Sequence, residues 1–342
     1  MDNDPAAPCA RYTAAFVQGS LMDYDAVIAF AKGLDALTIE IESVNVDALK
    51  AIRDAGVRVW PSPELIETIQ DKATQKQALT DAGIPVVPGV LVANAEELRQ
   101  HSSRLPAVLK LRRGGYDGKG VMVLRNDADL DTAFDAPCIL EDLVDIDQEI
   151  AVIVARNEAG EVAVYDPVRM VFDPKLNLLD FQVCPAGLPV LLEQEAISLA
   201  RQVAEGLNLV GLLAIEMFVT RDGVILVNEL APRPHNSGHH TIEACATSQY
   251  ENLLRVLIGL PVGSPTSLQS SVMVNIIEPQ AAARETMYSA LHGSLGIEGL
   301  HLHWYGKSGG RPGRKMGHVT VCASDVETAQ ARALHLRDLL KG

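Results

Sequence analysis

The sequence lacks the patterns that mark metal-knuckle, secreted and membrane proteins. Its 5 cysteines form no C-x-x-C pair and no H-E-x-x-H occurs, so a zinc site is not predicted. Scattered cysteines in a chain of 342 residues are typical of reduced thiols in a cytosol. No apolar run approaches the roughly 18 residues that span a bilayer, and the opening Met1-Asp-Asn-Asp-Pro does not resemble a signal peptide. We therefore expect a cytoplasmic protein without a membrane partner.

Positive charge is also scarce. The 29 lysines and arginines are outnumbered by 44 acidic residues, which gives a net charge of −15, and no long Lys/Arg tract occurs. Such a chain is a poor match for nucleic acid or an anionic membrane surface, so clustered cations are better explained as local anion sites. A hydrophobic content of 48% with a mean hydropathy of +0.11 excludes a disordered chain, and the length suffices for two or three domains.

Four of the cations lie in a glycine-rich stretch, residues 110–120, which begins at the end of the apolar strand predicted at 107–111. Its glycines allow positive φ and can turn backbone N–H groups toward an anion: Gly114, Gly115, Gly118 and Gly120. It is not a P-loop, because Arg113 and Gly120 stand where that motif needs Gly and Ser/Thr, and it is not a dinucleotide G-x-G-x-x-G. It indicates phosphate binding; a solvated hairpin loop is the alternative.

Two acids interrupt a predicted β-hairpin downstream. The apolar runs on either side of Arg221-Asp222-Gly223 carry Glu216 and Glu229, and Asn228 precedes the second acid. Carboxylates in apolar strands are costly unless a cation or metal pairs with them. Oxygen ligands on adjacent strands suit Mg²⁺, which takes one or two carboxylates and leaves other positions to water and phosphates. In the alternative interpretation, both acids lie on the solvent face of the sheet.

The loop after Glu229 is dense in hydrogen-bonding side chains. Prolines on both sides of Arg233 restrict its backbone and suit bidentate binding of a carboxylate, bicarbonate or phosphate. His235 and Asn236 follow directly. A surface loop with incidental histidines is the alternative.

Together these segments resemble the ATP-grasp superfamily, and more narrowly the ATP-dependent 5-(carboxyamino)imidazole ribonucleotide synthases of purine biosynthesis. The ordered set of motifs spans nearly the whole chain and is specific. It comprises Asp71-Lys72-x-x-Gln75-Lys76-Gln77, Ala82-Gly83-Ile84-Pro85, residues 114–120, residues 228–239, His303-Trp304-Tyr305-Gly-Lys307, and Arg311-Pro312-Gly313-Arg314-Lys315-x-Gly317-His318.

The resemblance implies an α/β and α+β architecture. We expect an ATP-grasp fold that has a truncated N-terminal Rossmann-like (pre-ATP-grasp) domain at 1–70, a lid and linker region at 71–148, a central domain at 149–264, and a small β-rich C-terminal domain at 265–342. It also implies a homodimer.

The resemblance further implies a chemistry: bicarbonate attacks the γ-phosphate of ATP to give carboxyphosphate, and the amine of aminoimidazole ribonucleotide captures the carboxyl group. Mg²⁺ would bind Glu216 and Glu229, and Arg233, His235 and Asn236 would handle bicarbonate and the intermediate. The ribonucleotide phosphate would bind Lys307, Arg311, Arg314 and Lys315. The implied ATP residues are Lys72, Lys110, Gly115, Tyr116, Asp117, Gly118, Lys119, Gly120, Glu141, Asp142, Leu143, Val144, Glu149, Asn228 and Glu229.

Three departures qualify this assignment. The family's N-terminal strand and Gly-Gly-Gly-Gln-Leu-Gly turn have no counterpart here, so we expect less cover for 27–30 and 37–41, and Mg·ATP binding with an incomplete ribonucleotide pocket. Ser43 stands where Asn is common, and Phe172 stands where some members have His. The alternatives are a non-catalytic ATP-binding remnant and another ATP-grasp ligase, such as formate-dependent glycinamide ribonucleotide transformylase.

The coarse secondary structure is alternating at first and then antiparallel. We predict helices at 24–33, 45–55, 71–82, 94–103, 191–207, 239–259 and 325–340. We predict strands at 36–42, 57–60, 86–92, 107–111, 121–124 and 138–141, an antiparallel sheet from 149–184 and 212–230, and further strands from 271 onward.

Overall fold

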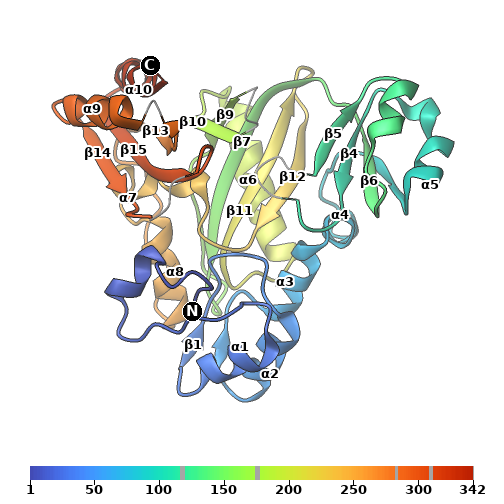
Figure 1. The fold of residues 1–342 in the computed structure, drawn as a ribbon, viewed down its shortest axis with the longest axis horizontal. Coiled ribbons are helices and arrows are strands. Elements are labelled where there is room, and N and C mark those ends of the chain that lie inside the picture. Colours follow the sequence, from blue (N-terminus) through green and yellow to red (C-terminus); the bar gives the residue numbers. More distant parts are fainter. Residues whose placement is uncertain (116–119, 174–177, 282–283, 308–310, 342) are drawn as a thin grey trace.

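The computed structural model describes residues 1–115, 120–173, 178–281, 284–307 and 311–341 (Figure 1). Within these residues the strands form three sheets, ordered β1-β2, β3-β6-β4-β5 and β12-β11-β7-β9-β10-β13-β15-β14, with β8 paired to β7. No helix among them is both long and apolar enough to cross a membrane.

The strands are β1 (Ala36–Leu37), β2 (Arg58–Val59), β3 (Gly89–Val92), β4 (Ala107–Leu111), β5 (Val121–Leu124), β6 (Cys138–Asp142), β7 (Ile146–Arg156), β8 (Val162–Val164), β9 (Val168–Asp173), β10 (Leu178–Cys184), β11 (Gly211–Thr220), β12 (Ile225–Ala231), β13 (Ser270–Ile277), β14 (Leu300–Trp304) and β15 (Lys315–Ala323).

The N-terminal region is a small α/β unit at the base of the molecule in Figure 1. A short helix η1 (Pro8–Tyr12) precedes α1 (Tyr24–Ala31), α2 (Val46–Asp54) and α3 (Pro63–Gln70), and the three α-helices begin at side-chain caps from Asp23, Asn45 and Ser62. The sequence analysis missed α3, although a serine cap followed by proline at the first helical position is a start signal.

The N-terminal strands are shorter than expected. The strand predicted at 36–42 is only Ala36–Leu37, which pairs in parallel with β2. The expected loss of cover is wrong for Leu37 and Ile39, which are buried, whereas Ile41 is 44% exposed. Met1 packs against this cluster, so the chain's own first residue supplies part of the cover.

The lid is the four-stranded sheet at the right of Figure 1, with α5 (Ala95–Gln100), η2 (Ser102–Arg104) and η3 (Asp127–Thr132) beside it. Alternation along its strands buries Leu109, Leu124 and Leu140 in one cluster. The opposite face carries Lys110 and Glu141. Helix α4 (Lys72–Asp81) leads into this region, as predicted, and starts at the Asp71 cap.

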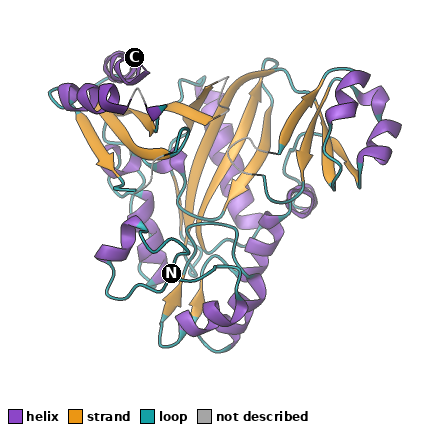
Figure 2. Ribbon diagram, viewed as in Figure 1, coloured by secondary structure: helices purple, strands orange, loops and turns teal. Residues whose placement is uncertain are grey.

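The central sheet is antiparallel, and α6 (Val190–Gly206) packs on it (Figure 2). The hairpin predicted around Arg221-Asp222-Gly223 is confirmed: β11 pairs with β12, and Gly223 has a φ of +81°. The predicted helix at 239–259 is interrupted. Helices α7 (Thr241–Ala244) and α8 (Gln249–Leu257) are separated where the Ser248 side chain accepts from Glu251 N and caps α8.

The C-terminal strands continue the central sheet, because β13 pairs with β10 and β15 lies between β13 and β14. Helices α9 (Arg284–Ser294) and α10 (Val326–Lys341) cover these strands, and α9 was not predicted. The domain boundary proposed at residue 265 remains a prediction, since strand pairing does not mark it.

Candidate active site

The site begins with two carboxylates placed opposite each other. Glu216 on β11 and Glu229 on β12 are cross-strand partners, and the register then shifts so that Met217 pairs with Val227. Asn228 is the extra residue of this bulge. In a regular strand Asn228 and Glu229 would point to opposite faces, but a bulge re-aims its side chains. Here Lys110 Nζ donates to Asn228 Oδ1 at 2.7 Å while Lys72 pairs with Glu229, so both residues meet lid-side lysines.

The two acids are less buried than the sequence suggested. The side chain of Glu216 is 21% exposed and that of Glu229 is 45% exposed, so neither lies in a sealed core. Burial, together with the carboxylates of Glu229 and Glu149, raises the pKa of Glu216 to about 8. Burial also raises the pKa of Glu149, on the neighbouring β7.

These oxygens fit a divalent cation that also binds phosphates. No group of three or more His, Cys, Asp or Glu that could hold a metal occurs in the described ranges. Magnesium needs no such group, because one or two carboxylates suffice when phosphates complete the coordination. Burial is the main cause of the raised pKa of Glu216 and the neighbouring carboxylates add to it, so a bound cation would favour the charged form.

Three lysines from α4 and β4, Lys72, Lys76 and Lys110, lie around one pocket beside the two strands. Lys110 on β4 lies 2.6 Å from Glu141, and Lys76 on α4 lies 2.5 Å from the other oxygen of the same carboxylate. Burial alone would raise the pKa of Glu141, but the two ammonium groups lower it overall. These side chains, with Lys72, Gln75 and Asn228, line one pocket.

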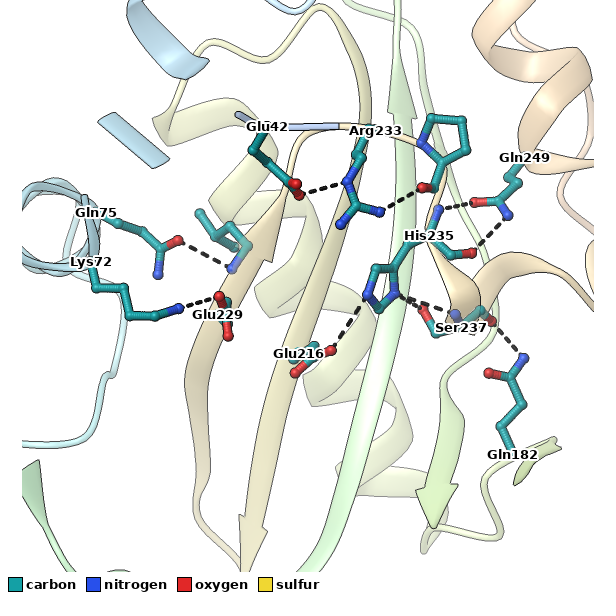
Figure 3. Close-up of polar contacts among 12 residues, drawn as sticks. Glu42, Lys72, Gln75, Gln182, Glu216, Glu229, Arg233, His235, Ser237 and Gln249 are labelled. Carbon is teal, nitrogen blue, oxygen red and sulfur yellow. Dashed lines mark hydrogen bonds and ion pairs between the residues drawn. The ribbon is translucent and has the colours of Figure 1, made fainter. Parts of the chain in front are cut away.

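The sequence analysis assigned no role to Gln75 and Lys76. Lys72, Gln75 and Lys76 have the spacing of one helix face, which was the signal available in the motif. Gln75 Oε1 accepts from the backbone N of Leu230 at 3.2 Å, so α4 is hydrogen-bonded to the strand that carries Glu229 (Figure 3).

Three of the residues expected to bind ATP, Asp142, Leu143 and Val144, lie at and after the end of β6. Asp142 N donates to Pro88 O at 2.9 Å, and the Asp142 carboxylate lies 2.6 Å from Arg104. The backbone N–H and the side chain of Asp142 therefore both have partners within the protein. Leu143 is 48% exposed. In the described part of the chain no backbone hydrogen bond engages Leu143 or Val144, so their N–H and C=O groups are available.

The glycine-rich loop is described only at its ends. Gly114 and Gly120 have φ values of +78° and +92°, as expected, and Leu111 N donates to Gly120 O at 2.8 Å. The predicted ATP residues Tyr116, Asp117, Gly118 and Lys119 lie outside the described residues.

The loop after β12 brings Arg233 and His235 next to acidic side chains (Figure 3). Arg233 lies 2.7 Å from Glu42 of the N-terminal region, and His235 Nε2 lies 3.6 Å from Glu216. Gln249 fixes the loop by accepting from His235 N at 3.0 Å and donating to His235 O at 2.9 Å. Burial and the charges of Arg233 and Lys315 lower the pKa of His235 to about 3, so its imidazole is neutral.

Asn236 completes this loop. Its side-chain oxygen and nitrogen are both buried, and neither has a hydrogen-bond partner among the described residues. An unsatisfied buried amide costs roughly 1–3 kcal/mol, so this pair of groups is suited to a polar ligand that supplies the missing bonds.

The C-terminal cations lie beside this loop. Lys307 Nζ donates to Lys315 O at 2.9 Å and stands 5.1 Å from the Tyr305 ring centroid. Arg314 is 4.0 Å from Asp4, and Arg311 is exposed. Lys315, on β15, contributes to lowering the pKa of His235 in this loop.

Three stacked imidazoles join the loop to the C-terminal strands. The ring of His318 on β15 lies between His239 and His303, with centroid distances of 4.5 and 4.4 Å. Tyr305 Oη is 2.8 Å from His318 Nδ1. Burial lowers the pKa of His318 to about 2 and that of His239 to about 3, so these rings are neutral in the folded protein.

Comparison with known proteins agrees with this geometry. A curated relative from Synechococcus elongatus, named N5-carboxyaminoimidazole ribonucleotide synthase, is 38% identical over 341 residues, covering 96% of this chain and 84% of the relative. Family models match in order the ribonucleotide synthetase preATP-grasp domain at 1–70, the ATP-grasp domain at 77–250 and the phosphoribosylaminoimidazole carboxylase C-terminal domain at 271–332. The chain belongs to the N5-carboxyaminoimidazole ribonucleotide synthase family.

Solved members of this family share the fold. The enzyme from Thermotoga maritima superposes with a TM-score of 0.89 at 39% identity, covering 99% of this chain and 90% of that chain. The enzyme from Aspergillus clavatus, in complex with ADP and 5-aminoimidazole ribonucleotide, has a TM-score of 0.91 at 32% identity and covers 99% and 91%. The predicted ATP-grasp fold, with its pre-ATP-grasp and C-terminal domains, is confirmed.

We expect Gly238→Ala to lower turnover in this synthase-family protein about tenfold or more. A Cβ at Gly238 would lie 2.4 Å from Gln249 Oε1 and 2.5 Å from Cδ, so Gln249 must leave the backbone groups of His235. Gly293→Ala is the control, because a Cβ there meets nothing within 4 Å. Steady-state kinetics should show a lower kcat with little change in ATP binding; an unchanged kcat would contradict the role given to Gln249.

The buried histidines should make the protein acid-sensitive. Burial lowers the pKa of His239, His240 and His318 to about 3, 4 and 2, so below pH 6.5 the unfolded chain binds protons that the folded protein does not. Stability is therefore retained above pH 6.5 and lost as the pH falls, by about 1.4 kcal/mol per pH unit for each group.

Urea unfolding at pH 7.5 and 5.5 measures this effect. His318→Asn should reduce the pH dependence of the unfolding free energy by the contribution of about one proton, whatever its effect on the absolute stability. The control is His335→Asn, at an exposed position of α10, which should leave the pH dependence unchanged. Equal slopes in wild type and His318→Asn would contradict a buried, neutral His318.

Proposed function

We propose that this protein carboxylates the amine of 5-aminoimidazole ribonucleotide with bicarbonate at the expense of ATP. The observation that carries the proposal is the opposed pair Glu216 and Glu229, facing Lys72 and Lys110 beside the Arg233–Asn236 loop. A bicarbonate oxygen attacks the γ-phosphorus and ADP leaves; the amine then attacks the carboxyl carbon, phosphate leaves, and the amine loses a proton. The products are N5-carboxyaminoimidazole ribonucleotide, ADP and phosphate.

The lid and the central sheet would hold the nucleotide between them. Lys72 and Lys110, with Lys76 beside them, would offset phosphate charge, and Leu143 and Val144 offer backbone groups for a base. Glu216 and Glu229 would hold Mg²⁺, which when bound supplies positive charge for the β- and γ-phosphates. Catalysis of this kind rests on positioning and electrostatics. Closure against water is needed because carboxyphosphate hydrolyses readily.

The Arg233–Asn236 loop would hold bicarbonate and the intermediate. A guanidinium binds a carboxylate through two parallel hydrogen bonds, and the unpartnered amide of Asn236 adds a donor and an acceptor. In the free protein the Arg233 guanidinium pairs with Glu42. An incoming bicarbonate would therefore displace the Glu42 carboxylate from Arg233. Because His235 is neutral, it can hold a proton at one ring nitrogen without adding charge to the site.

The C-terminal cations would bind the ribonucleotide phosphate: Lys307, Arg311, Arg314 and Lys315. The net charge of −15 supports a small-molecule partner and not nucleic acid or a membrane surface. We also propose that the protein acts as a cytoplasmic homodimer.

Phosphate release tests the proposal. We expect release that requires ATP, Mg²⁺, bicarbonate and aminoimidazole ribonucleotide together, with each omitted in turn as a control. ATP binding without ribonucleotide-dependent release would favour the non-catalytic alternative. Release that instead depends on formate and glycinamide ribonucleotide would favour the other ligase, although the C-terminal family match at 271–332 argues against it.

Glu216→Gln and Glu229→Gln should each abolish turnover while the fold is retained, because the change removes a charge and little volume. Glu195→Gln, at an exposed position of α6, is the matched control. Wild-type phosphate release by either site variant would refute the metal assignment.

Arg311→Ala and Arg314→Ala should raise the KM for the ribonucleotide and leave the KM for ATP nearly unchanged. A hydrogen bond to a charged group contributes about 1.5–3 kcal/mol, which corresponds to a rise of roughly tenfold or more. Arg255→Ala removes a surface ion pair with Glu251 on α8 and serves as the control. Equal damage to both KM values would indicate a structural role.

A further inference from the structure

One buried carboxylate links the two elements that carry the lysines of the candidate site. Asp71 is 4% exposed and precedes α4, the helix with Lys72 and Lys76. Its Oδ1 accepts from Ala73 N at 2.9 Å, which caps that helix. The same carboxylate accepts from the two arginines that follow β4, the strand that carries Lys110.

The contact with Arg112 is a two-point one. Arg112 Nε donates to Asp71 Oδ1 at 3.0 Å and its Nη2 donates to Oδ2 at 2.8 Å, while Arg113 Nε donates to Oδ2 at 3.1 Å. A backbone bond runs beside them, from Lys72 N to Arg112 O at 2.9 Å. A bidentate arginine–carboxylate pair fixes orientation as well as distance, so it sets how α4 lies against the end of β4.

This arrangement bears on the proposed nucleotide site and rests on that proposed function. Lys72 reaches Glu229, Lys76 reaches Glu141, and Lys110 reaches both Glu141 and Asn228. The lysines come from two elements that are far apart in the sequence, and like charges do not converge unless something holds their backbones. Asp71 lies where the two backbones meet, and its negative charge balances arginines that would add to the repulsion.

We propose that Asp71 is a positioning residue for Mg·ATP: it holds α4 and the end of β4 together so that Lys72, Lys76 and Lys110 face one phosphate-binding space. Asp71 does not touch the nucleotide. Its loss therefore weakens nucleotide binding through the lysines, and leaves the ribonucleotide side of the site, on β15 and the Arg233–Asn236 loop, unchanged.

Replacing Asp71 with asparagine separates its two roles, which are capping α4 and pairing with Arg112. Asn caps a helix about as well as Asp does, as Asn45 does for α2. It cannot form the charged two-point pair with Arg112. Asp71→Asn should therefore keep α4 intact and release the end of β4. Asp23→Asn is the matched control, because Asp23 also caps a helix, α1, by accepting from Ala26 N, and among the described residues no arginine pairs with it.

Isothermal titration with Mg·ATP and steady-state kinetics test the proposal. We expect Asp71→Asn to weaken Mg·ATP binding and to raise the KM for ATP about tenfold, with the KM for the ribonucleotide unchanged, while Asp23→Asn matches wild type. Wild-type ATP affinity in a folded Asp71→Asn protein would overturn the proposal. Equal losses for both substrates, with a lowered melting temperature, would also overturn it, because they indicate a general structural role.

A double-mutant cycle with Arg112→Gln adds a second readout. If Asp71 acts through Arg112, then Asp71→Asn combined with Arg112→Gln should bind Mg·ATP no more weakly than the weaker single variant. Additive losses would overturn the linkage. Failure of wild type to bind Mg·ATP would instead refute the proposed function, so the two hypotheses fail by different observations.

Discussion

The site depends on the placement of two carboxylates directly across adjacent strands. Glu216 and Glu229 cannot both be charged at low cost in a partly enclosed cleft unless positive charge is brought to them. The strands supply none, so the cations come from α4 and from the lid. Only when sheet, helix and lid are assembled do these acids face positive charge, and burial together with the neighbouring carboxylates still raises the pKa of Glu216.

In the site proposed above, the protein's own acids would hold the places of the ligands in the free state. Glu229 holds Lys72, Glu141 holds Lys76 and Lys110, and Glu42 holds Arg233. Each cation is thus kept oriented before any phosphate or bicarbonate arrives. A ligand then exchanges one anionic partner for another, which avoids much of the cost of ordering long side chains on binding.

The sequence revealed features whose chemistry is local and missed those that depend on tertiary contacts. Acids in apolar strands and prolines around Arg233 stand out in the chain itself, so the hairpin and its loop were predicted. The bulge at Asn228 has no compositional signal, because one extra residue is visible only from the pairing of both strands. The link from Asp71 to Arg112 spans 41 positions. The break before α8 was hidden because apolar periodicity continues across it, although Ser248 offered a cap.

The continuous sheet from β12 to β14 has a consequence for how the family can diversify. Glu216, Glu229, Lys315 and His318 all belong to strands of one hydrogen-bonded sheet, whereas Lys110 and Glu141 belong to the separate lid sheet. In the proposed site, a change in the lid would alter the part of nucleotide binding that Lys110 and Glu141 carry, whereas Lys315 and the metal-binding acids share one sheet. A substitution in the lid can therefore be tolerated without rebuilding the strands that would hold the ribonucleotide.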